Sequence, residues 1–214
     1  VYTNKAVYDI QFGNVERNTH QNTSWDAAKF EVSAHKWVDL SDGSYGVSLL
    51  NDCKYGYSCI GSDLSLTALK CGTYPNPDAD QGLHIFSYSI LPHIGDFRTK
   101  TVPEAYAFNQ PLDVCKIEKQ NGSLPEEFSF VSIDSPNAVV ETIKQSEGQD
   151  GIVLRVYDAQ NANRLINLSF GLSVKKAYVC DMLENIIEEI PVSNDKLTVE
   201  LKNYEILTLK VVLK

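Results

Sequence analysis

The residues of this sequence best suited to bind a metal or to act as nucleophiles are four histidines and five cysteines. The histidines form no HxH or HExxH pair, and no two cysteines stand at the close spacing of a zinc site, so a metal centre is not predicted. An odd number of cysteines argues against a full disulfide framework, although Cys53 and Cys59 could cross-link a hairpin. We expect reduced thiols that pack as small apolar side chains. These residues are His20, His35, His84, His93, Cys53, Cys59, Cys71, Cys115 and Cys180.

Acidic and aromatic residues give two further candidates for chemistry. Adjacent carboxylates occur at residues 126–127 and 188–189, but neighbouring residues of a strand point to opposite faces, so neither pair can flank one bond. Trp25 and Trp37 could each form a platform on which a sugar ring stacks. The alternative, which we favour, is that these aromatics pack against the core or another domain. The sequence therefore predicts no catalytic residue.

Composition argues against several classes of partner. The 214 residues carry a net charge of −9, and the sequence pI is about 4.9. Nucleic acids and anionic membrane surfaces are bound by clustered Lys and Arg, so neither is expected. The chain has no run of 18 apolar residues and begins at Val1, inside a strand-like stretch. We therefore expect a piece of a longer protein with no membrane span.

Alternation of apolar and polar residues with a period of two dominates the chain and predicts β-strands. Turn residues such as Ser41-Asp42-Gly43 separate the alternating runs, as in a sandwich or a barrel. Residues 105–109 and 182–187 could be short helices, but no helix of normal length is required. The expected strands are residues 29–35, 46–50, 64–69, 84–90, 128–133, 139–144, 152–157, 165–170, 175–179, 197–201 and 206–212.

Residues 111–127 interrupt this pattern. They contain Pro, Gly, Ser and charged residues without sustained alternation, which is typical of a segment between domains. We therefore predict an all-β protein with one domain at residues 1–115 and a second at residues 116–214.

Several long blocks of the first half are similar to segments of family 38 α-mannosidases, and to the cytosolic and bacterial branch in particular. The second half resembles the terminal β-sandwich of that family more loosely, at residues 151–157 and 205–209. The first-half blocks are VERNTHQNTSWD (residues 15–26), FEVSAHKWVDLS (residues 30–41), YGVSLLNDCKYGY (residues 45–57), YPNPDADQGLH (residues 74–84) and SYSILPH (residues 87–93).

The resemblance implies a fold and a role for each domain. Residues 1–115 are expected to end a mutarotase-like β-supersandwich, and residues 116–214 to form the small β-sandwich that follows it. Family 38 enzymes are retaining α-mannosidases whose nucleophilic aspartate and zinc ligands lie on an N-terminal α/β domain. Nothing in this sequence corresponds to that domain, so the resemblance implies a non-catalytic region that is inactive alone, with zinc bound elsewhere in the intact enzyme.

The resemblance also implies that the β region closes one side of the substrate cleft, and two turns are our candidates for that rim. Carboxylate and amide oxygens accept hydrogen bonds from sugar hydroxyls, Lys and Gln donate, and a tyrosine ring can lie against a sugar. Residues of these types in turns also commonly cap the backbone, so a structural role stays open. The candidates are Asn51, Asp52, Lys54 and Tyr55 in one turn and Asp80 and Gln81 in the other.

The expected partners are an α-mannoside or oligosaccharide substrate, bound through the intact enzyme, and the N-terminal catalytic domain. A homo-oligomer is possible and the expected location is cytoplasmic, both by resemblance. The alternative is a free-standing carbohydrate-binding β-sandwich module. Such a module should not expose a wide apolar surface, whereas a region that packs against a missing domain should do so.

Overall fold

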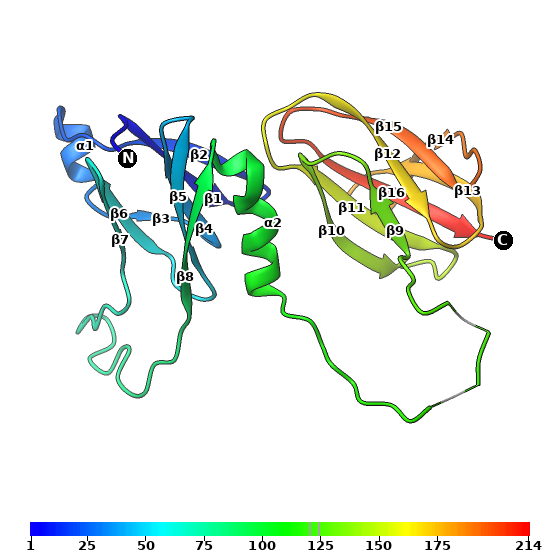
Figure 1. The fold of residues 1–214 in the computed structure, drawn as a ribbon, viewed down its shortest axis with the longest axis horizontal. Coiled ribbons are helices and arrows are strands. Elements are labelled where there is room, and N and C mark those ends of the chain that lie inside the picture. The colour runs from blue at the N-terminus through cyan, green and yellow to red at the C-terminus, as the bar shows by residue number, and fades with distance from the viewer. Residues whose placement is uncertain (120, 124) are drawn as a thin grey trace. The chain divides into compact units, whose positions relative to one another are not determined.

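The computed structural model describes residues 1–119, 121–123 and 125–214, which form two compact units, Val1–Val114 and Cys115–Lys214 (Figure 1). In each unit a five-stranded sheet packs with a three-stranded sheet, and all paired strands run antiparallel. This architecture confirms the expected all-β fold class. None of the helices in the described residues is long and apolar enough to cross a membrane.

The first unit contains a large sheet in the order β2-β1-β4-β5-β8, a small sheet in the order β3-β6-β7, and two helices. The strands of the large sheet are β1 (Lys5–Ile10), β2 (Gly13–Asn18), β4 (Trp37–Ser41), β5 (Tyr45–Asn51) and β8 (Tyr88–Ile94). The small sheet consists of β3 (Val32–Ser33), β6 (Gly56–Ile60) and β7 (Asp63–Leu66), and the helices are α1 (Ser24–Ala28) and α2 (Phe97–Asn109).

Strand β4 is covered on both faces, because successive side chains of a strand point in opposite directions. Val38 and Leu40 face the small sheet and share a core with Tyr8 and Tyr57. Trp37 faces the other way and stacks on Phe97 of α2, with ring centroids 5.1 Å apart. Helix α2 therefore lies against the face of the large sheet opposite the small one (Figure 1).

Helix α2 corrects the prediction that no helix of normal length is required, because it has 13 residues and not the five expected at residues 105–109. It begins after Asp96, whose side chain accepts a hydrogen bond from the amide of Arg98 at 2.9 Å. Pro103 lies inside the helix, and the buried residues Phe97, Thr101, Val102 and Ala105 recur at helical spacing along one face. Proline is a strong helix breaker in isolation, so the tertiary contacts decide this element.

Three predicted strands of the first half are shorter than expected, and the one expected at residues 64–69 ends at Leu66. At residues 29–35 the strand is reduced to Val32–Ser33, because Lys29 still belongs to the end of α1 and donates its backbone N–H to Asp26 O at 3.1 Å. At residues 84–90 the strand begins only at Tyr88, opposite Asn51. The preceding residues belong to a loop between β7 and β8.

The second unit is a β-sandwich in which six of eight strands match the predicted bounds to within one residue. The strand expected at residues 128–133 begins only at Val131, and the strand Ile186–Ile190 was not predicted. Its sheets have the orders β10-β11-β16-β13-β14 and β15-β12-β9. Residues 182–187 are not a helix, because β14 occupies the second part of that segment. The strands are β9 (Val131–Ile133), β10 (Ala138–Gln145), β11 (Ile152–Asp158), β12 (Arg164–Phe170), β13 (Val174–Cys180), β14 (Ile186–Ile190), β15 (Lys196–Leu201) and β16 (Ile206–Leu213).

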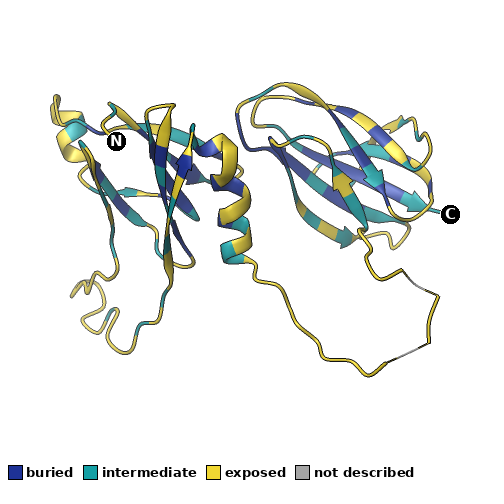
Figure 2. Ribbon diagram, in the orientation of Figure 1, coloured by how far each residue is buried: buried dark blue, intermediate teal, exposed yellow. Residues whose placement is uncertain are grey.

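The inward faces of both sheets fill the core of this sandwich with aliphatic side chains (Figure 2). Leu154 and Leu209 come from the large sheet, and Ile166, Leu168 and Leu197 from the small one, and all are essentially inaccessible to water. Burial of such side chains contributes about 1.5–3 kcal/mol each relative to exposure, so this core is the main source of the unit's stability.

A buried polar cluster holds α2 on the large sheet of the first unit. Asp39 Oδ1 accepts hydrogen bonds from Ser48 Oγ at 2.7 Å and from His93 Nε2 at 2.6 Å. Thr101 Oγ1, on α2, lies 2.6 Å from Ser48 Oγ. Because the hydroxyl proton of Ser48 points to Asp39, Thr101 donates to Ser48. The cluster lies where β4, β5, β8 and α2 meet.

Gly46 is required beside this cluster, and its replacement by alanine should destabilise the first unit. A Cβ at position 46 would stand 2.4 Å from His93 Cε1 and 2.6 Å from Ser41 Cβ. Relief of that overlap should cost about 1–3 kcal/mol of unfolding free energy. Urea unfolding followed by tryptophan fluorescence checks this, because both tryptophans, Trp25 and Trp37, belong to the first unit.

Gly72→Ala is the matched control, because a Cβ at position 72 meets no heavy atom closer than 3.9 Å. Equal urea midpoints for the two variants would show that the close packing around Gly46 contributes nothing.

Candidate functional site

The turn between β5 and β6 is built around the side chain of Asn51, which is 1% exposed. Its Nδ2 donates to His35 O at 2.8 Å and contacts the hydroxyl of Tyr57. Its Oδ1 accepts from the backbone amides of Cys53 and Lys54. All of its polar atoms are therefore engaged inside the unit, which favours a positioning role for Asn51 over the predicted contact with sugar.

Two hollows border this turn, and Tyr55 lines both of them. The larger is an open groove of about 520 Å³ to which Lys54 and Asp80 also contribute, and the smaller has a volume of about 430 Å³. The structure thus brings one residue of the second predicted turn to the groove beside the first turn. The remaining polar side chains of the larger groove are Glu31, Ser33, Cys53, Thr67, Lys70 and His84.

The three predicted residues in the groove present different chemistry. Lys54 carries a positive charge, and its Nζ lies 4.9 Å from the ring centroid of Phe86. Tyr55 is 61% exposed, and its ring meets His35 edge to face at 5.8 Å, which leaves most of the ring open. Asp80 adopts a positive φ of 58°, and its carbonyl is bonded to His84 Nε2 at 2.8 Å.

Asp52 and Gln81 are bonded to neighbouring backbone. Both carboxylate oxygens of Asp52 accept from the amide of Ser87 at 3.0 Å. The hydrogen bond from this amide, followed in size by that from the Cys53 thiol, lowers the pKa of Asp52 below its ordinary value. Gln81 Nε2 donates to Pro77 O at 3.3 Å. Asp52 thus ties the turn to the residues before β8, and Gln81 does not line either hollow.

Glu31 and Thr67 belong to the groove but were not predicted from the sequence. Thr67 Oγ1 donates to Glu31 Oε1, which fixes the carboxylate in the groove wall. Gly56 makes room for this pair, because a Cβ there would stand 2.8 Å from Glu31 Oε1. The only signal for Glu31 was its place in an alternating segment, which by itself indicates a solvated strand face.

The buried serine, histidine and aspartate are not a catalytic triad. In such a triad the histidine bonds the serine through one ring nitrogen and the aspartate through the other. Here both Asp39 and Ser48 meet Nε2 of His93, at 2.6 and 3.1 Å. The side chains of His93 and Asp39 are also inaccessible to solvent. The cluster is therefore a packing element and not a nucleophile.

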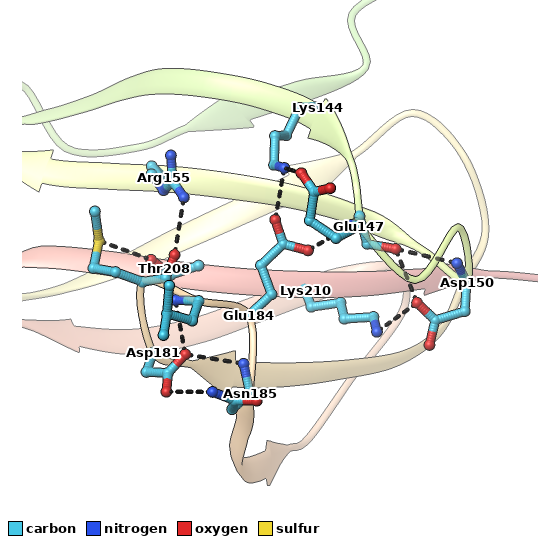
Figure 3. Close-up of polar contacts among 12 residues, drawn as sticks. Lys144, Glu147, Asp150, Arg155, Asp181, Glu184, Asn185, Thr208 and Lys210 are labelled. Atoms are coloured by element: carbon cyan, nitrogen blue, oxygen red, sulfur yellow. Dashed lines mark hydrogen bonds and ion pairs between the residues drawn. The ribbon is translucent and has the colours of Figure 1, made fainter.

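The second unit carries a polar cluster across one face of its large sheet (Figure 3). Glu184 lies in the β13–β14 connection and bonds Lys144 Nζ at 2.7 Å and the backbone amide of Glu147 at 2.7 Å. Lys210 pairs with Asp150 at 2.5 Å. These contacts brace the β13–β14 connection and the β10–β11 turn against each other, and they satisfy the charges that they bring together.

In the part of the chain that the structure describes, no three His, Cys, Asp or Glu side chains lie close enough together to hold a metal ion. All five cysteines are free thiols, so the Cys53–Cys59 cross-link does not form.

Comparison with known proteins identifies the family. Residues 1–78 match the glycosyl hydrolases family 38 C-terminal domain, and residues 137–209 match the glycosyl hydrolases family 38 C-terminal beta sandwich domain. Human alpha-mannosidase 2C1 is 39% identical over the whole chain. The chain belongs to glycosyl hydrolase family 38. Its two matched segments are C-terminal domains of that family.

Two further relatives of this family 38 region agree with that assignment. Alpha-mannosidase G of Dictyostelium discoideum is 35% identical over 97% of the chain, and an alpha-mannosidase of Saccharomyces cerevisiae is 37% identical over 84%. The chain spans about a fifth of each of these proteins, with 21% of the human, 20% of the Dictyostelium and 18% of the yeast sequence covered.

Solved structures of the family share the fold of this region. A family 38 protein from Enterococcus faecalis superimposes with a TM-score of 0.79 over 98% of the chain, at 18% sequence identity. An alpha-mannosidase from the same organism superimposes with a TM-score of 0.74. In each case about a quarter of the solved chain is matched, 25% and 24% respectively.

Asn51→Ala should destabilise the first unit by about 1–3 kcal/mol, because His35 O and the Tyr57 hydroxyl lose a buried donor. Urea unfolding followed by tryptophan fluorescence measures the loss. Asn22→Ala, at an exposed position, is the control and should leave the midpoint unchanged. A midpoint for Asn51→Ala equal to that of the wild type would contradict the internal role of this side chain.

Glu184→Gln should weaken the second unit at neutral pH and flatten its loss of stability in acid. The Lys144 ammonium and the Glu147 amide hold the pKa of Glu184 below its ordinary value. In the unfolded chain the pKa of a glutamate is about 4.3. Because the pKa of Glu184 is lower in the folded chain, its carboxylate stabilises the fold at pH values above about 4.3. This stabilisation is lost as the pH falls through the pKa of Glu184 in the folded chain. The amide NMR signals of β11, followed through urea titrations between pH 7 and 3, report the effect.

Glu188→Gln, at an exposed position of the same hairpin, is the control and should lose stability in acid as the wild type does. If both variants show the wild-type pH dependence, the ion pair of Glu184 does not stabilise the unit.

Proposed function

We propose that the enzyme to which this region belongs hydrolyses α-mannosides, and that the region forms one side of its substrate cleft without supplying catalytic groups. The observation that carries this proposal is the 39% identity with an α-mannosidase over the whole chain. We propose the groove beside Tyr55 as the position where sugar binds, because residues of both predicted turns line it.

The groove has the chemistry to hold a sugar. Lys54 donates hydrogen bonds to hydroxyl oxygens, Asp80 and Glu31 accept from hydroxyl groups, and the open ring of Tyr55 covers an apolar sugar face. Retaining hydrolysis needs a nucleophile and an acid/base group about 5–5.5 Å apart. We assign those groups, and the zinc expected for the family, to the catalytic domain of the intact enzyme.

The outward face of β8 supports a partner domain. Tyr88, Ile90 and Ile94 alternate along this edge strand and are exposed, and Ile94 is paired with the exposed Tyr45 of β5. A contiguous row of exposed apolar side chains on an edge strand is unfavourable in a free-standing protein and normal in an interface. The catalytic domain is the partner that we propose for this face.

A free-standing carbohydrate-binding module is the second candidate, and Trp25 is the observation that favours it. This tryptophan is 78% exposed on α1, whereas Trp37 is buried under α2. An exposed indole is a common platform for a sugar ring. The two candidates differ in where a sugar binds, at the groove or at Trp25.

A cytoplasmic location follows from the same proposal. Five free cysteines are typical of a reducing compartment, since oxidising compartments favour disulfides. Assembly of the intact enzyme as a homo-oligomer remains a prediction from the family resemblance.

The chain alone should not hydrolyse a chromogenic α-mannoside, with or without added zinc or cobalt, because we assign the catalytic groups to another domain of the intact enzyme. It should bind mannose weakly in an NMR titration, with shifts at the amides of Lys54 and Tyr55. Lys54→Ala should weaken binding about tenfold, since one hydrogen bond to a charged donor is lost. Lys175→Ala, exposed in the second unit, is the control.

Turnover above a purified blank would refute the non-catalytic assignment. Shifts confined to the indole of Trp25 would refute the groove and support the free-standing module.

A further inference from the structure

The candidate turn is joined to helix α2 by one side chain. Asn109, the last residue of α2, donates through Nδ2 to Asn51 O at 3.0 Å and to Ala105 O at 2.9 Å. An amide nitrogen has two hydrogens, so both donors of Asn109 are used. The side chain thus links the backbone of the helix end to the backbone of the turn, and it has no donor left for a ligand.

The helix is itself fixed to the sheet at two other points. Thr101 donates to Ser48 inside the buried cluster, and Phe97 stacks on Trp37. A third contact lies near the turn, where Nζ of Lys36 stands 4.8 Å from the ring centroid of Tyr106. Because these anchors lie along the whole length of α2, its C-terminal end has a defined position over the start of the turn.

The turn receives its other support from its own side chains and from the loop that precedes β8. Asn51 binds the amides of Cys53 and Lys54, and Asp52 binds the amide of Ser87. Asp52, Cys53 and Tyr55 are exposed, so packing does little to hold this segment. Its geometry depends on hydrogen bonds to the backbone, of which the bond from Asn109 is the one that comes from α2.

We propose that helix α2 positions the turn of residues 51–55, the proposed site of sugar contact. Asn109 is the positioning residue and acts through Asn51. Thr101 and Phe97 fix the helix on the sheet. Asn109, at the end of the helix, then holds the backbone of the turn through its hydrogen bond to Asn51 O, and Lys54 and Tyr55 extend from this turn. Asn109 lines the smaller hollow and not the groove, so it acts on the groove through the backbone of the turn. The functional part of this proposal rests on the proposed binding of sugar by the turn.

Hydrogen exchange of the whole chain, read by NMR at single amides, tests the positioning itself. Asn109→Ala should accelerate exchange of the Cys53 and Lys54 amides about fivefold, the loss of one neutral hydrogen bond. The urea midpoint should fall only slightly, and the amides of β1 should accelerate no more than that fall accounts for. Glu104→Ala, at an exposed position of the same helix, should leave all of these rates at the wild-type value.

Asn109→Asp is a second variant of nearly the same shape, and it cannot donate to the two carbonyls. It should accelerate the same two amides as Asn109→Ala does. Thr101→Ser keeps the hydroxyl that bonds Ser48, so it should preserve wild-type exchange at the turn, whereas Thr101→Val should accelerate it. Wild-type exchange at Cys53 and Lys54 in both Asn109 variants would overturn the proposal.

A mannose titration of the same variants separates the positioning from the proposed function. If α2 positions a sugar-binding turn, Asn109→Ala should weaken mannose binding about fivefold while Glu104→Ala does not. If exchange accelerates but neither the wild type nor the variants bind mannose, the positioning stands and the proposed function fails. If mannose binds the wild type and Asn109→Ala equally while exchange accelerates, the proposed role of Asn109 in binding is wrong.

Discussion

The first unit depends on a buried carboxylate. Asp39 lies on the central strand of a sheet that is covered on both faces, and a polar group in such a place is tolerated only when hydrogen bonds replace its water. Ser41, Ser48 and His93 supply these bonds. Because the network extends to Thr101, satisfying this one carboxylate also fixes the helix that covers it.

A short chain of contacts links the buried cluster around Asp39 to the groove. The helix fixed at Thr101 ends at Asn109, which holds the backbone of Asn51, and Asn51 in turn shapes the turn that carries Lys54 and Tyr55. A rigid sheet and helix therefore present an otherwise exposed turn. This is the arrangement expected of a binding surface, where side chains that face solvent need support from a packed layer behind them.

The two units differ in how their surfaces are completed. In the second unit Lys144 pairs with Glu184 and Lys210 pairs with Asp150 across one face of the large sheet. In the first unit the outward face of β8 leaves Ile90 and Ile94 exposed. The face that we propose for the catalytic domain is thus on the unit that also carries the groove.

The sequence by itself determined most strands of the second unit, the all-β class and the family, because alternation and long ordered blocks are local features of the chain. Residue type and the family resemblance also selected six candidates for sugar contact, of which Lys54, Tyr55 and Asp80 line the groove. Only the tertiary structure decided that α2 has 13 residues despite Pro103, that Asn51 is buried, and that Glu31 and Thr67 belong to the groove. The physical reason is that each of these depends on contacts between residues distant in the sequence, which no local pattern records.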